Sequence, residues 1–96
     1  GGYDSNFVIS GHPVATTVGD QTGITMVTDT DQPGVQLYTA NALTDRKGKY
    51  GKEYCSRSAF CLETQHYPDS IHHPQWPSCI LRKDEAFHSF TSYTFS

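Results

Sequence analysis

The chain has few hydrophobic residues and no long apolar run. Only 35% of its 96 residues are hydrophobic, against about 45–50% in typical domains when glycine is also counted. Small domains bury a smaller fraction of their surface than large ones. No apolar stretch approaches the ~20 residues of a membrane-spanning helix. We therefore expect no membrane association, and we expect the chain to form a poor core by itself.

Positive charge is also sparse. Seven Lys and Arg residues against ten Asp and Glu residues give a net charge of −3. The sequence shows no basic cluster of the kind that follows a phosphate backbone, so nucleic acid is not an expected partner. No signal peptide is visible, and we expect a cytoplasmic location, while a signal peptide upstream of residue 1 stays open.

Cysteine is scarce and its count is odd. Cys55, Cys61 and Cys79 are the only cysteines. Reduced thiols in a cytoplasmic protein are the favoured interpretation. A Cys55–Cys61 bridge remains the alternative, because spacing alone does not decide whether two cysteines are joined.

Convincing helix patterns are absent, whereas strand signals recur between turn residues. Short strands separated by turn signals are typical of an all-β sandwich. The last strand places Phe87, Ser89, Thr91, Tyr93 and Phe95 on one face. A polar, charged segment at 44–53 is predicted to be an exposed loop, and a second loop contains Pro68, Pro74 and Pro77. The predicted strands are residues 7–9, 22–28, 35–39, 59–64, 79–82 and 86–96.

Four short elements together carry a resemblance to a known family. Their sequences are Gly-Tyr-Asp-Ser-Asn-Phe at 2–7, Asp-Gln-Pro-Gly-Val-Gln-Leu-Tyr-Thr-Ala-Asn at 31–41, Phe-Cys-Leu-Glu-Thr-Gln-His-Tyr-Pro-Asp at 60–69 and His-Pro-Gln-Trp-Pro-Ser at 73–78. In this order they resemble elements of the aldose 1-epimerases, the galactose mutarotase family. One such element alone would be a weak signal, but four in the family's order cover nearly the whole chain.

The resemblance implies an all-β fold, a large antiparallel β-sandwich of the galactose mutarotase type. The matching elements belong to the C-terminal part of that fold. We therefore expect residues 1–96 to be the C-terminal portion of an aldose 1-epimerase domain, incomplete on its own. The expected partner is the N-terminal remainder of the same enzyme, either in the same chain or as a separate one.

The resemblance also implies an activity, the interconversion of the α and β anomers of a free hexose such as galactose or glucose. This general acid/base reaction requires no metal and no organic cofactor. The family's catalytic acid, a second histidine and an arginine lie upstream of residue 1, so activity is not expected from the 96 residues alone. A non-catalytic carbohydrate-binding or partner-binding module derived from a mutarotase is the alternative.

Three residues match functional positions of the family. The resemblance makes Glu63 the catalytic base and makes Asp4 and Gln36 substrate-binding residues. A carboxylate works as a base near neutral pH when partial burial raises its pKa, and we expect Phe60, Leu62 and Tyr67 to surround Glu63. The structural alternatives are a surface glutamate, an Asx-turn at Asp4 and an ordinary cross-strand glutamine at position 36.

Some positions depart from the family pattern. Ser5 stands where His is common, Ala40 where Gly is usual and His72 where Asn is common. None of the five histidines occupies the position of the family's acid. They are His12, His66, His72, His73 and His88.

The loop after Glu63 invites two further interpretations. His66, Asp69, His72 and His73 are dense enough to suggest zinc, but a solvated loop between prolines is favoured. Trp76 between Pro74 and Pro77 suits a core position better than a sugar-stacking one.

Overall fold

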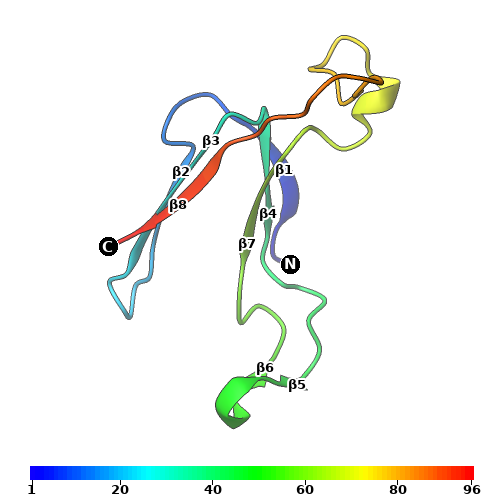
Figure 1. Ribbon diagram of the computed structural model, residues 1–96. Helices are drawn as coiled ribbons and strands as arrows, with labels where there is room; N and C mark the ends of the chain where they lie inside the picture. The colour runs from blue at the N-terminus through cyan, green and yellow to red at the C-terminus, as the bar shows by residue number, and fades with distance from the viewer.

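The computed structural model describes residues 1–96, which form antiparallel strands and two single-turn 3-10 helices (Figure 1). Neither of the helices has the length or the apolar character needed to cross a membrane. The all-β class expected from the sequence is therefore confirmed. The elements are β1 (Asp4–Val8), β2 (Ala15–Val18), β3 (Thr25–Thr30), β4 (Gly34–Tyr38), β5 (Arg46–Lys47), η1 (Lys49–Gly51), β6 (Glu53–Tyr54), β7 (Cys61–Gln65), η2 (Ser70–His72) and β8 (Thr91–Phe95).

The strands form two three-stranded sheets and one short hairpin. The first sheet has the order β1-β4-β7 and the second has the order β2-β3-β8, while β5 pairs only with β6. All pairings are antiparallel. Side chains alternate between the two faces of a strand, so the register decides which residues each face presents.

The two sheets meet along β7 and β8 and diverge away from this contact, as Figure 1 shows. Thr64 Oγ1 of β7 lies 2.7 Å from Thr91 Oγ1 of β8. The hydroxyl of Tyr93 donates to the carbonyl oxygen of Leu62 at 2.7 Å. These contacts identify the inner faces, which carry Val35, Leu37 and Leu62 in the first sheet and Thr28, Thr30 and Tyr93 in the second.

The space between the sheets is only partly filled. Seven of 96 residues are buried, and Val35 and Ala40 are the only hydrophobic ones among them. The radius of gyration is 16.2 Å, whereas a compact chain of about 100 residues has a value near 13 Å. Much apolar surface is consequently exposed, including that of Phe87, Phe90 and Phe95.

Most predicted strands are present, with shifted ends. The structure adds β2 and the β5–β6 hairpin, which the sequence did not indicate. The predicted strand at 79–82 is wrong, because the segment forms no strand and Ile80 and Leu81 remain exposed. Apolar, β-prone residues become a strand only where a neighbouring strand pairs with them.

The predicted strand at 86–96 is correct only from Thr91 onward. Residues 86–90 form no strand, and the ladder with β3 begins at the pair Thr30–Thr91. Before that pair, the backbone of Phe90 is bonded to the turn after β3, because its N–H donates to Asp31 Oδ1 at 3.0 Å. Asp31 N–H in turn donates to the Phe90 carbonyl oxygen at 3.2 Å. These turn contacts replace a regular ladder.

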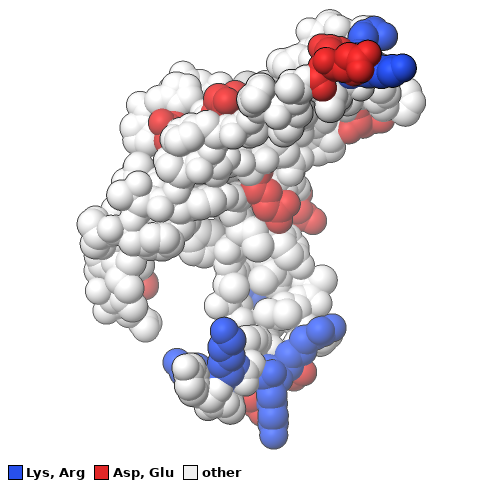
Figure 2. Space-filling model, viewed as in Figure 1, with Lys and Arg blue, Asp and Glu red and all other residues white.

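The expectation that positive charge is not clustered is also wrong. Figure 2 shows Lys and Arg side chains gathered on the projecting β5–β6 hairpin. Four of the seven basic residues fall in this hairpin, namely Arg46, Lys47, Lys49 and Lys52. The absence of a basic cluster was the argument against a nucleic-acid partner, and this argument no longer holds.

All three cysteines are free and exposed. Cys55 and Cys61 are not joined in this structure, and the reduced state of the thiols stays a prediction.

Candidate functional site

One face of the first sheet is polar and the other is apolar. Val35, Leu37 and Leu62 point inward, so the intervening residues of the same strands point outward. We call the polar residues of this outward set the polar face, which leaves aside Val8, Gly34 and Cys61. Its members are Asp4, Asn6, Gln36, Tyr38, Glu63 and Gln65.

The register brings the three predicted site residues together on this face. Gln36 pairs directly with Glu63 across β4 and β7 and with Asn6 across β4 and β1. Asp4 lies diagonally from Gln36, whose Nε2 donates to Asp4 Oδ1 at 2.8 Å. A carboxylate, an amide and a second carboxylate thus lie side by side, although they come from three separate parts of the sequence.

The expected shielding of Glu63 is mostly wrong. Glu63 and Asp4 are exposed and Gln36 is half-buried. Leu62 points to the opposite face of β7. Phe60 lies beside the second sheet, where it lines a hollow with Met26 and Phe95. Of the three expected neighbours, only Tyr67 lies on the polar face.

Tyr67 reaches the polar face because residue 34 is glycine. A Cβ at Gly34 would lie 3.0 Å from the Tyr67 ring and 2.7 Å from Asn6 Oδ1. The absence of a side chain therefore lets Tyr67 and Asn6 pack onto the backbone of β4. Tyr67 also meets Trp76 edge to face, with ring centroids 5.5 Å apart.

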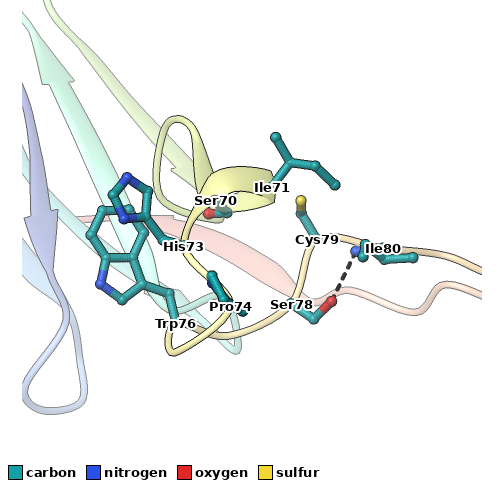
Figure 3. A pocket seen from close by; sticks show the side chains of 8 residues that line it. All are labelled: Ser70, Ile71, His73, Pro74, Trp76, Ser78, Cys79 and Ile80. Atoms are coloured by element: carbon teal, nitrogen blue, oxygen red, sulfur yellow. Dashed lines mark hydrogen bonds between the residues drawn. The ribbon is translucent and has the colours of Figure 1, made fainter.

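The loop that carries His73 and Trp76 packs against Tyr67 at one end of the polar face. The His73 ring stacks on Trp76 at a centroid distance of 3.9 Å. Figure 3 shows this stack beside a hollow of about 140 Å³ that Cys79 also lines. Trp76 lines a second hollow, of about 260 Å³, with Asn6 and Tyr67. It is half-buried rather than a core residue, so the expected core position is wrong for the chain as it stands.

The start of β1 is fixed by a small hydrogen-bond network. The N–H of Tyr3 donates to Thr39 Oγ1 at 2.8 Å, and Thr39 Oγ1 donates to Asn41 Oδ1 at 2.7 Å. Asn41 Nδ2 donates back to the Tyr3 carbonyl oxygen at 2.9 Å. Gly2 has a positive φ of 93°, and a Cβ there would lie 2.0 Å from Asn41 Oδ1. The network joins two of the four family-like elements and places Asp4 at the strand's first position.

Two departures from the family pattern can now be located. Ser5 lies on the inner side of β1, opposite to Asp4, and the orientation of Asp4 comes from Gln36 instead. Ala40 is buried with φ of 53°, a left-handed conformation that glycine adopts without strain.

Apart from His73, which stacks on Trp76, the histidines contact groups away from the polar face. His12 Nδ1 lies 2.6 Å from Asp29 Oδ1, and this hydrogen bond lowers the pKa of the Asp29 carboxyl. Asp69 Oδ1 contacts His72 Nδ1, and Asp69 Oδ2 lies 3.5 Å from His73 Nε2. His66 lines a hollow with Leu81 and Phe87. His88 is exposed, in the segment before β8.

Sequence reasoning missed one member of this site, Asn6, which lies on the polar face but carries no family assignment. Tyr67 was expected beside Glu63, but its contact with Gly34 was not. Asn6 could have been found from the sequence, because it lies two residues after Asp4 and residues two apart on a strand share one face. Nothing local in the sequence shows that Tyr67 bends back over Gly34.

Comparisons with known proteins found similar sequences in one family. The family model described as aldose 1-epimerase matches residues 1–94. Human galactose mutarotase is 40% identical over 100 residues, covering 99% of this chain and 29% of that protein. The aldose 1-epimerase of Escherichia coli (strain K12) is 35% identical over 68 residues, covering 69% of this chain and 20% of that protein.

A solved structure shares the fold. The crystal structure of a GalM/aldose epimerase homologue from C. elegans superposes with a TM-score of 0.85 at 28% identity, over 99% of this chain and 30% of that chain. This chain thus spans about 29% of the length of the curated relatives that match it along its whole length, and it corresponds to their C-terminal part. The 96-residue chain therefore belongs to the aldose 1-epimerase family.

Proposed function

We propose that residues 1–96 are the C-terminal portion of an aldose 1-epimerase domain that interconverts the α and β anomers of a free hexose such as galactose or glucose. In this proposal Glu63 is the general base, and Asp4 and Gln36 bind sugar hydroxyls. The acid comes from the upstream portion of the domain. The sparsely filled space between the sheets supports a missing portion, because fifteen large hydrophobic side chains are exposed.

Each proposed role follows from the chemistry of mutarotation. Glu63 accepts the proton of the anomeric hydroxyl while the acid protonates the ring oxygen, and the C1–O5 bond breaks. Rotation about C1–C2 presents the other face of the aldehyde. The O5 hydroxyl then attacks C1, and the protons return in the reverse sense. One base and one acid on opposite sides of the sugar are sufficient.

The observation that carries the proposal is the arrangement of Asp4, Gln36 and Glu63 on one open face. Because Gln36 Nε2 is bonded to Asp4, one carboxylate oxygen of Asp4 remains for a sugar hydroxyl. Glu63, which is exposed and paired in register with Gln36, is accessible to the anomeric end. Ionised carboxylates accept several hydroxyl hydrogen bonds at defined angles, which suits sugar recognition.

The first prediction tests the base in a completed domain. We define this domain as residues 1–96 joined to the upstream part of their own protein or to the corresponding part of human galactose mutarotase. Glu63→Gln should lower the rate of anomer interconversion by about 10²–10⁴-fold, the usual effect of removing a general base. Polarimetry of freshly dissolved α-glucose and α-galactose gives the rate, and Glu53→Gln on the distant hairpin is the matched control.

Two results would contradict this assignment in different ways. Equal rates for the Glu63→Gln variant and the parent would show that Glu63 is not the base. A parent that binds hexose but does not exceed the spontaneous rate would instead support the non-catalytic carbohydrate-binding module.

A further inference from the structure

The polar face contains two buried polar atoms that lack a partner. Asn6 Nδ2 and Gln36 Oε1 are shielded from solvent and make no hydrogen bond. The first is a donor and the second an acceptor. An unsatisfied buried group of this kind costs about 1–3 kcal/mol. Two such atoms on one face therefore require an explanation.

The two atoms belong to residues that face each other. Asn6 and Gln36 are direct partners in the β1–β4 ladder, and their side chains share one face. Directly opposed residues of an antiparallel pair have Cβ atoms about 4.5–5.5 Å apart. A modest rotation of either side chain would therefore bring donor and acceptor to hydrogen-bonding distance.

The surroundings restrict how each side chain can turn. Gln36 Nε2 donates to Asp4 Oδ1 at 2.8 Å. This hydrogen bond fixes the orientation of the amide and directs Gln36 Oε1 away from Asp4. The Asn6 side chain lies over Gly34 beside Tyr67, in space that a Cβ at position 34 would take. If the Gln36 amide were inverted, two oxygen acceptors would face each other at Asp4.

We propose that Asn6 is a positioning residue for sugar binding, acting through Gln36. When a hexose occupies the polar face, Asn6 Nδ2 donates to Gln36 Oε1. This bond holds the amide with its Nε2 toward Asp4 and leaves the second oxygen of Asp4 directed at the sugar. Asn6 Nδ2 itself does not contact the sugar, because this atom is shielded from solvent. The inference rests on the proposed function and deepens its binding step.

Substitution in the completed domain tests this role. Asn6→Leu keeps the number of side-chain atoms but removes the donor. It should raise KM about five-fold and change kcat less than about two-fold, since one hydrogen bond is worth about 1 kcal/mol and 1.4 kcal/mol corresponds to a ten-fold change. Ser5→Ala, on the opposite side of the same strand, should leave both constants unchanged.

A double-mutant cycle separates a positioning role from a structural one. In a Gln36→Met background, Asn6→Leu should change KM less than about two-fold, because the residue it positions is gone. Additive effects on KM would overturn the proposal, as would a fall in kcat with an unchanged KM. Thermal melts of all four proteins check that differences in stability do not produce the pattern.

A direct measurement needs no substitution. In a completed domain labelled with ¹⁵N-asparagine, the Asn6 side-chain N–H resonances should move downfield and exchange more slowly when galactose is added. Unchanged resonances at saturating galactose would overturn the proposal even if Asn6→Leu did not fold. This readout follows binding rather than turnover. A domain that binds sugar without catalysis would therefore refute the proposed reaction and still test Asn6.

Discussion

Polar side chains line both the inner face of the second sheet and the outer face of the first, but their hydrogen bonds differ. In the second sheet, Thr30 Oγ1 donates to the Phe90 carbonyl oxygen at 2.7 Å, lies 3.0 Å from Thr91 Oγ1 and accepts from the Gln32 N–H at 3.1 Å. On the polar face of the first sheet, Gln36 has one partner and one unsatisfied atom. Thr30 Oγ1 is thus fully paired within the chain, although Thr28 Oγ1 on the same inner face has no partner. On the polar face, Gln36 Oε1 is unpaired and the second oxygen of Asp4 remains for a ligand.

Removing the Thr30 hydroxyl should have the largest effect on stability. Thr30→Val keeps the shape but deprives the buried Gln32 N–H of its partner and the Phe90 carbonyl oxygen of one of its two donors, so we expect about 2 kcal/mol lower unfolding free energy. Hexose affinity should change little. Urea unfolding of the completed domain measures the difference. A loss of sugar affinity at unchanged stability would reverse the contrast between the two sheets.

Removing the Gln36 amide should weaken hexose binding and change stability little, the reverse of the effect of Thr30→Val. Gln36→Met retains the length of the side chain, and we expect hexose binding to weaken about ten-fold while the unfolding free energy falls by less than about 1 kcal/mol. Calorimetric titration with galactose gives the affinity. If Gln36→Met destabilised the domain as much as Thr30→Val, Gln36 would be an ordinary cross-strand residue.

Ala40 should tolerate glycine with almost no change. Glycine relieves about 1–2 kcal/mol of left-handed strain, but it adds about 0.5–1 kcal/mol of unfolded-chain entropy and loses about 0.8 kcal/mol of methyl burial. These contributions nearly cancel, so we expect the unfolding free energy of Ala40→Gly to lie within about 1 kcal/mol of the parent. Ala40→Val should be clearly worse, because a β-branched residue at positive φ is strained. Equal melting temperatures for the two variants would refute the argument.

The His12–Asp29 pair should give the smallest effect, and a pH-dependent one. The hydrogen bond from His12 lowers the pKa of Asp29 below 3.8, so the stabilisation is fully present above that value. It is lost as the pH falls through the lowered folded-state pKa. His12→Gln should move the Asp29 carboxyl titration upward, as followed by ¹³C NMR between pH 6 and 2. An unchanged titration would mean that Thr30 N–H alone sets it.

The sequence predicted the fold class because strand signals and family elements occur where strands exist. It predicted the grouping of Asp4, Gln36 and Glu63 through the resemblance alone, since nothing local reveals that β1 and β7 flank β4. It failed at 79–82 and 86–90, where apolar residues have no pairing strand in the chain. The prediction that Phe60 shields Glu63 failed, because Phe60 packs beside the second sheet and not on the polar face. The sequence also missed that Arg46, Lys47, Lys49 and Lys52 gather on one hairpin.

The alternation along β4 has a consequence for quality control. Val35 and Leu37 face the interior, and Gln36 between them faces the site. A slip of one residue in the pairing of β4 would move every side chain to the opposite face. The slipped chain would expose its apolar residues and lose the Asp4–Gln36–Glu63 grouping in the same event. A mispaired molecule would thus expose apolar surface and lack the proposed sugar-binding group, so chaperones and proteases that detect exposed apolar strands would also remove these copies.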